Sequence, residues 1–197
     1  SMFIEEGLRS LKHTFRPALQ AFLEILGEGE VAAGGFTKII SSLNAGESVN
    51  FKHESYALLV NSSKSACLDL ANTLISKTTF KQMKIKQISE EVERRISQKP
   101  DQAIIFEGDP AWKLTLAGPV ASTIYSKHNK PTFIYKKGDT ESAGSVRSPK
   151  GKDSVQAMKT CADFLITYGG HPQASGFRVK NEDLEKFEKK LIEHFSK

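Results

Sequence analysis

The sequence predicts an α/β protein in which a helical connector region, residues 1–98, precedes a small α/β domain, residues 99–197, with a mixed sheet flanked by helices. Two observations predict this. In the first half, apolar residues recur at three- and four-residue steps, which is the period of an amphipathic helix. After Pro100, short apolar runs alternate with helical patterns, which is typical of a sheet covered by helices.

In the first region the helical period is set by Leu8, Leu11, Phe15, Leu19, Phe22, Leu23 and Leu26. Pro17 predicts a break between two helices, because proline lacks the N–H that a helix interior needs. The later elements are expected in this order: a glycine loop at 27–35, a short apolar element at 36–43, a turn at 44–46, and helices at 54–60 and 65–96. On the last helix, Lys77, Lys81 and Lys84 share one face. That stripe could follow a phosphate backbone, and a solvated helix face is the commoner alternative.

The second region is expected to hold strands at 103–106, 132–135, 143–147 and 175–179, and helices at 116–128 and 154–168. Pro119 is placed in the first turn of its helix, where proline is tolerated. Asn181 is expected to cap a last helix that is acidic at its start and basic at its end, as the helix dipole favours.

The composition favours a cytoplasmic protein with an anionic partner. The net charge is +5, and nucleic acid is the commonest partner of basic proteins. Cys67 and Cys161 have no partner spacing and are expected to be reduced and buried. No apolar run approaches the ~18 residues of a membrane span, and nothing resembles a signal peptide. Ser1 before Met2 is typical of the scar of a cleaved tag.

Two polar motifs carry the candidate chemistry. Gly169 and Gly170 permit close backbone approach, and His171 can donate to an anion. The alternative is a glycine helix cap with an incidental histidine. In Gly144-Ser145-Val146-Arg147-Ser148, alternation along a strand puts Ser145 and Arg147 on one face, a combination that suits a phosphate or an exposed strand end. The five histidines are scattered and the aspartates isolated, so no metal centre is predicted.

The two motifs together, with a helix between them, resemble the accessory C-terminal domain of the DHH phosphoesterases and, more narrowly, the RecJ family of single-strand-specific DNA exonucleases. Residues 7–19 resemble the helical segment that follows the family's catalytic domain. Leu43-Asn44-Ala45 resembles its (I/L)-N-A motif, and Trp112 with Gly118-Pro119-Val120-Ala121-Ser122 resembles its W…G-x-V-A-S helix start. The arginines that usually flank the asparagine motif are absent here.

This resemblance implies a parent enzyme that degrades single-stranded DNA from the 5′ end with two Mn²⁺ or Mg²⁺ ions held by an N-terminal DHH domain, in DNA repair and recombination. By motif position, Arg147, Ser145 and Ser148 would bind a substrate phosphate, with Gly169, Gly170 and Asn44 beside the substrate, and His171 would act catalytically at the scissile phosphate. The chain would bind no metal and be inactive alone. Its implied partners are single-stranded DNA, its own DHH domain and single-strand-binding protein.

Two other functions remain open. One is the accessory domain of a DHH oligoribonuclease or nucleotide phosphatase, against which the long helical connector argues. The other is a non-catalytic RecJ-related replication scaffold, which would have no need of Arg147 and His171.

Overall fold

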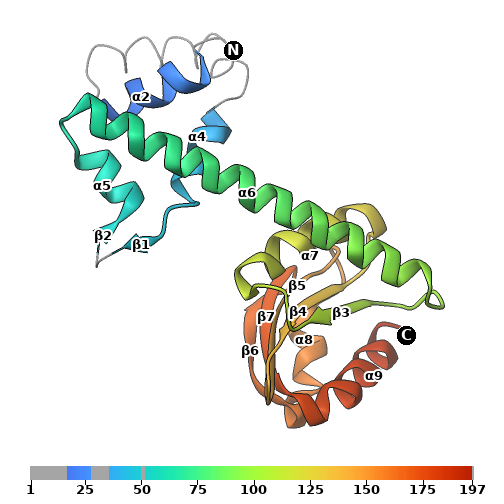
Figure 1. Cartoon of the computed structure of the whole chain (residues 1–197). Helices are drawn as coiled ribbons and strands as arrows, with labels where there is room; N and C mark the ends of the chain where they lie inside the picture. The colour runs from blue at the N-terminus through green and yellow to red at the C-terminus, as the bar shows by residue number, and fades with distance from the viewer. Residues whose placement is uncertain (1–16, 28–35, 50–51, 197) are drawn as a thin grey trace. The chain divides into compact units, whose positions relative to one another are not determined.

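The computed structural model describes residues 17–27, 36–49 and 52–196, and the chain divides into two compact units, residues 1–83 and 84–197. The boundary falls inside the 34-residue helix α6 (Lys64–Ser97; Figure 1), so residues 84–97 of this helix belong to the C-terminal unit. The helical turns expected around Leu8 and Phe15 and the glycines expected to form a loop at 29–35 lie outside the described residues.

The described part of the first unit is helical apart from one small hairpin. It contains α2 (Pro17–Leu26), α4 (Phe36–Leu43), β1 (Ser48–Val49), β2 (Lys52–His53), α5 (Glu54–Val60) and the first half of α6. The expected helix at 54–60 is confirmed, and Pro17 is the first residue of α2, where its missing N–H costs no helical bond. The hairpin was not predicted, because two-residue strands are too short to show a period.

The C-terminal unit is built on a five-stranded sheet in the order β3-β4-β5-β7-β6. The strands are β3 (Ile105–Asp109), β4 (Thr132–Lys137), β5 (Glu141–Arg147), β6 (Leu165–His171) and β7 (Ala174–Lys180). β3 and β4 run parallel through the crossover helix α7 (Leu114–His128), and the other neighbours are antiparallel. The predicted α/β class with a mixed sheet is confirmed.

Helices cover the two faces of the sheet unequally. On one face, α7 packs on β4 and β5 (Figure 1). Val120 and Ile124 of α7 are buried together with Ile134 of β4 and Val92 of α6. The other face carries an aromatic cluster beneath α8 (Ser154–Lys159) and α9 (Leu184–Phe195). On the α7 side the surface is open at Gly169 of β6, where an added Cβ would meet no atom within 4 Å. This uncovered part of the sheet positions the candidate site.

The expected helix at 154–168 is wrong. Only Ser154–Lys159 is α-helical; a 3₁₀ turn, η2 (Ala162–Phe164), follows, and Leu165–His171 is strand β6. The helix ends where the Thr160 hydroxyl donates to the Ala157 carbonyl. Ile166, Thr167 and Tyr168 favour a strand, and Thr167 and Tyr168 pair with Arg178 and Phe177 of β7, with a register shift at Ile166. The Gly-Gly-His motif therefore lies on a strand and does not cap a helix.

Two smaller predictions are also wrong. Helix α7 starts at Leu114, so Pro119 is its sixth residue and removes the N–H that would donate to the Thr115 carbonyl. Asn181 does not cap α9, whose N-cap is Asp183. It lies in η3 (Asn181–Asp183), and its side chain accepts from the Ser142 hydroxyl at 2.7 Å and donates to the Gly138 carbonyl at 2.8 Å. Asn181 thus fastens the loop ahead of β5 to the end of β7.

Candidate functional site

Strand register brings Arg147 and His171 to one face of the sheet. Arg147 of β5 lies opposite Ala174 of β7, and Ala174 lies opposite His171 of β6. Residues directly opposite each other in antiparallel strands project from the same face. The two polar side chains therefore belong to one row, two strand spacings apart, or about 10 Å.

The next row of residues across the same three strands carries only small side chains or none. Ser145 lies opposite Gly176, and Gly176 lies opposite Gly169. An added Cβ at Gly176 would meet only the Gly144 carbonyl, at 3.3 Å. We call the surface formed by Ser145, Arg147, Gly169, His171, Ala174 and Gly176 the Arg–His face. A flat ligand or a phosphate can approach the sheet backbone there without meeting large side chains.

Arg147 carries a charge that the described residues do not balance. No carboxylate among them lies within ion-pair distance of its guanidinium, and the side chain is half-buried. Arg95, also half-buried, shows the contrast: it pairs with Asp109 at 2.6 Å and with Glu91, and it holds the pKa of Asp109 below its usual value. Because a buried charge is normally paired, Arg147 has the environment of an anion-binding group.

Helix α7 holds the Arg147 side chain in place. Arg147 Nε donates to the Ser122 hydroxyl at 3.1 Å, and Nη1 donates to the Val146 carbonyl at 2.8 Å. An added Cβ on Gly118 would lie 3.5 Å from Arg147 Nη2 and 3.6 Å from the Ser145 hydroxyl. The family motif at 118–122 therefore meets the 144–148 motif in space, a contact that the sequence analysis did not foresee.

Ser148 lies apart from the Arg–His face. It is 2% exposed, and its hydroxyl donates to the Lys152 carbonyl at 2.6 Å. Its amide donates to the Gln173 carbonyl at 3.0 Å, while the Ser154 hydroxyl donates to the Pro172 carbonyl at 2.8 Å. These bonds tie the loop after Arg147 to the turn after His171. Ser148 and Ser154 thus have structural roles, and Ser154 carried no signal in the sequence.

The two glycines of the Gly-Gly-His motif are placed differently. Gly170 has φ of +131°, and a Cβ there would lie 2.7 Å from the Ala174 carbonyl oxygen. Gly169 needs no such backbone and faces open space on the Arg–His face. Gly170 therefore serves the backbone geometry of the hairpin, and Gly169 keeps the face clear.

The remaining candidates lie elsewhere. Asn44 belongs to the first unit, where it is exposed just after α4. Lys77 forms an ion pair with Glu54 of the same unit, with 2.7 Å between Nζ and Oε2. The hydrogen bond from Lys77 holds the pKa of Glu54 below its usual value. Across residues 17–27, 36–49 and 52–196, no group of three or more histidine, cysteine, aspartate or glutamate side chains could hold a metal ion. None of the helices in these ranges combines the length and the apolar character that a membrane span requires.

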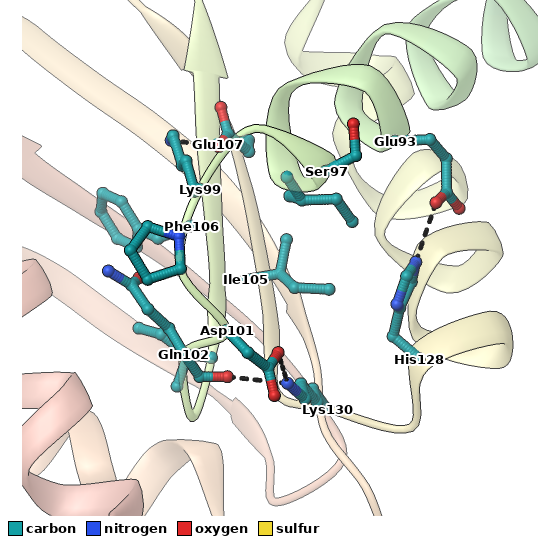
Figure 2. A pocket seen from close by; sticks show the side chains of 13 residues that line it. Glu93, Ser97, Lys99, Asp101, Gln102, Ile105, Phe106, Glu107, His128 and Lys130 are labelled. Carbon is teal, nitrogen blue, oxygen red and sulfur yellow. Dashed lines mark hydrogen bonds and ion pairs between the residues drawn. The ribbon is translucent and has the colours of Figure 1, made fainter.

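A pocket of about 300 Å³ opens beside β3, the edge strand opposite β6 (Figure 2). Its charged groups are paired with one another: Lys99 with Glu107, Lys130 with Asp101, and His128 with Glu93. Burial tends to raise the pKa of Glu93, but the neighbouring His128 and Lys127 outweigh it and hold the pKa below its usual value. Internally matched charges offer little to a charged ligand, so the Arg–His face is the stronger candidate site.

Comparison with known proteins agrees with the fold and the motifs. Residues 100–197 match the DHHA1 domain family. The chain is 26% identical over 196 residues to the single-stranded-DNA-specific exonuclease RecJ of Bacillus subtilis, covering 95% of this chain and 25% of that protein. It is 24% identical over 178 residues to the RecJ exonuclease of Thermus thermophilus, covering 89% of this chain and 26% of that protein. The chain thus spans about a quarter of the length of these relatives.

Solved structures share the fold. A crystal structure of RecJ in complex with Mg²⁺ from Thermus thermophilus matches with a TM-score of 0.82 at 21% identity, covering 97% of this chain and 30% of that one. A crystal structure of exonuclease RecJ bound to manganese matches with a TM-score of 0.82 at 22% identity, covering 98% of this chain and 48% of that one. Residues 100–197 therefore belong to the DHHA1 domain family, and the chain as a whole shares its fold with part of these RecJ structures.

Proposed function

We propose that the Arg–His face binds the phosphates of single-stranded DNA, as the substrate-gripping part of a RecJ-like 5′–3′ exonuclease. The observation that carries this proposal is the guanidinium of Arg147, unbalanced by any described carboxylate, in one row with His171 across a glycine floor. Arg147, Ser145 and His171 can all donate hydrogen bonds to a ligand on this face. That arrangement suits a nucleotide whose phosphate accepts these hydrogen bonds while its sugar and base extend along the sheet.

Each residue has a distinct role in this proposal. Arg147 and the Ser145 hydroxyl donate to the non-bridging oxygens of one phosphate. His171, exposed at the end of β6, donates to the scissile phosphate as negative charge develops on its oxygens. Gly169 lets the sugar–phosphate chain lie close to the backbone. Asn44 belongs to the first unit and is proposed as a substrate contact on its sequence motif alone. Ser148 is left out, because its hydroxyl is already bonded.

Phosphodiester hydrolysis itself requires groups that the described residues do not bring together. Among the described residues, no three histidine, cysteine, aspartate or glutamate side chains come together in a group that could hold a metal ion. The Mn²⁺ or Mg²⁺ ions of the proposed parent enzyme would be held by a DHH domain. We propose that this domain and single-strand-binding protein are partners of the chain. The chain alone is expected to bind DNA without cleaving it.

Binding of a fluorescent single-stranded oligodeoxynucleotide, followed by anisotropy at about 50 and 200 mM salt, tests the proposal. Arg147→Ala is expected to weaken binding about 10-fold. It should also reduce the slope of log affinity against log salt concentration by about one, because one phosphate contact is lost. Arg94→Ala removes an exposed arginine of α6 and serves as the charge-matched control. Equal affinities for Arg147→Ala and Arg94→Ala would rule out the Arg–His face. An RNA oligomer of the same sequence, bound more tightly, would instead favour an oligoribonuclease-type accessory domain.

A further inference from the structure

The Arg147 guanidinium is already oriented before any ligand arrives. A guanidinium carries five N–H groups, and the structure uses the Nε hydrogen on Ser122 and one Nη1 hydrogen on the Val146 carbonyl. These two bonds leave from different nitrogens, so together they fix the plane of the group as well as its position. No acceptor among the described residues takes the hydrogens on Nη2, which can therefore bond a ligand.

Ser122 is suited to accept this bond because its own proton is committed. Its hydroxyl donates to the Gly118 carbonyl at 3.1 Å, one helical turn earlier, so a lone pair faces Arg147 Nε. The helix beneath is rigid, since Val120, Ala121 and Ile124 are fully buried against the sheet and α6. Ser122 therefore presents a fixed acceptor.

Gly118 completes the arrangement by leaving space. It lies one turn before Ser122 on the same helix face, directly over Arg147 Nη2 and the Ser145 hydroxyl. A methyl group there would sit at ordinary contact distance, 3.5 Å and 3.6 Å, from both donors. It would cause no clash, but it would cover the groups that a phosphate must reach.

We propose that Gly118 and Ser122 form a slot on α7 that orients the Arg147 guanidinium for phosphate binding, with Ser122 as a positioning residue that acts only through Arg147. This inference rests on the proposed function. A mobile arginine side chain loses rotamer entropy when a ligand fixes it, and this loss weakens binding. The slot already orders the Arg147 side chain in the free protein, so less entropy is lost when the ligand binds. A two-pronged contact with phosphate also needs the guanidinium plane to be correctly turned.

The test is a double-mutant cycle on the whole chain, with anisotropy of a single-stranded oligodeoxynucleotide as the probe. Ser122→Ala is expected to weaken binding about three- to ten-fold, the usual effect of losing one hydrogen bond. In the Arg147→Ala background it should weaken binding no further. Ser126→Ala is the matched control, because Ser126 makes the same back-bond on α7, to the Ser122 carbonyl at 2.8 Å, one turn later. The Ser126→Ala variant should bind the oligodeoxynucleotide with the same affinity as the unsubstituted chain.

A second measurement needs no ligand. In ¹H–¹⁵N spectra of the free chain, the Arg147 Nε–H is expected to exchange slowly with water, and Ser122→Ala should accelerate that exchange while Ser126→Ala does not. An equal loss of affinity from Ser122→Ala with and without Arg147, or unchanged Nε–H exchange, overturns the positioning role. If Arg147→Ala itself leaves binding unchanged while the exchange effect is seen, the proposed function fails and the slot is only structural.

Discussion

Arg147 and His171 share one row and one face of the sheet, although a loop, a helix and a strand separate them in the sequence. Their spacing is fixed by more than the strands. The Ser148 amide bonds the Gln173 carbonyl, and the Ser154 hydroxyl bonds the Pro172 carbonyl, so the loop after one residue is fastened to the turn after the other. These bonds hold the backbone positions of Arg147 and His171 at a fixed spacing.

His171→Ala is expected to lower turnover at least ~10-fold in a longer protein that carries the catalytic domain, because it removes a donor to charge that develops in the transition state. The melting temperature should not change, since His171 is exposed. Single-turnover cleavage of a 5′-labelled oligonucleotide gives the rate. Gln173→Ala, an exposed neighbour in the same turn, is the control, and equal rates for the two variants would exclude His171 from the site.

Alanine substitutions at the two adjacent glycines should separate folding from binding. Gly170→Ala places a Cβ 2.7 Å from the Ala174 oxygen at a φ of +131°, so it should destabilise the chain by about 1–3 kcal/mol. Gly169→Ala meets open space and should leave unfolding by urea nearly unchanged, yet weaken DNA binding several-fold. The reverse order of stabilities would contradict the strand geometry described for β6.

Gly118→Ala should raise the stability of the chain and weaken its binding of single-stranded DNA. Alanine is favoured over glycine in a helix by up to about 1 kcal/mol. The new methyl group fits, at 3.5 Å from Arg147. The same methyl group covers the Arg147 and Ser145 donors, so affinity for single-stranded DNA should fall. Thermal melting and anisotropy on one protein preparation check both effects. A variant that gains stability and keeps full affinity would show that phosphate does not approach from the α7 side.

Glu188→Gln should stabilise the chain at pH 7 and not at pH 4. Burial raises the pKa of Glu188, and the nearby Glu107 and Glu185 raise it further against Lys99. A carboxyl whose pKa is raised on folding weakens the folded state once pH rises through that pKa, and has no such effect below its unfolded value. The expected gain at pH 7 is about 0.5 kcal/mol, measured by urea unfolding at both pH values. Glu193→Gln, an exposed change on α9, should show no such difference.

Residues 84–197 should fold alone, whereas residues 100–197 should not. The shorter piece loses Ile85, Ile88 and Val92 of α6, which are buried against α7, and the Arg95–Asp109 ion pair. Each buried aliphatic side chain contributes about 1.5–3 kcal/mol, so their sum approaches the whole stability of a small domain. Near-ultraviolet circular dichroism and a cooperative melt distinguish the outcomes. A cooperative melt of residues 100–197 would show that α6 is dispensable.

Pattern and propensity predicted the elements whose periods were long or whose ends carried proline or glycine. The long helix expected at 65–96 and found at Lys64–Ser97, and the mixed sheet, are examples. The segment 160–168 was assigned wrongly, because a helical spacing of apolar residues competed with the strand preference of Ile166, Thr167 and Tyr168, and only pairing with β7 decides between them. The contact between Ser122 and Arg147 could not be predicted, because it depends on how far a helix slides along a sheet.

Strand β6 is an edge strand with six of its seven residues exposed. Leu165 packs against the aromatic cluster beneath the sheet, and Gly170 has a backbone that favours glycine, but the other side chains of β6 can be exchanged without disturbing that cluster. Natural variation can act on this strand at little cost to folding. Thr167 and Gly169 project from the same face as His171, so exchanges at these two positions can reshape the Arg–His face while the rest of the domain stays unchanged.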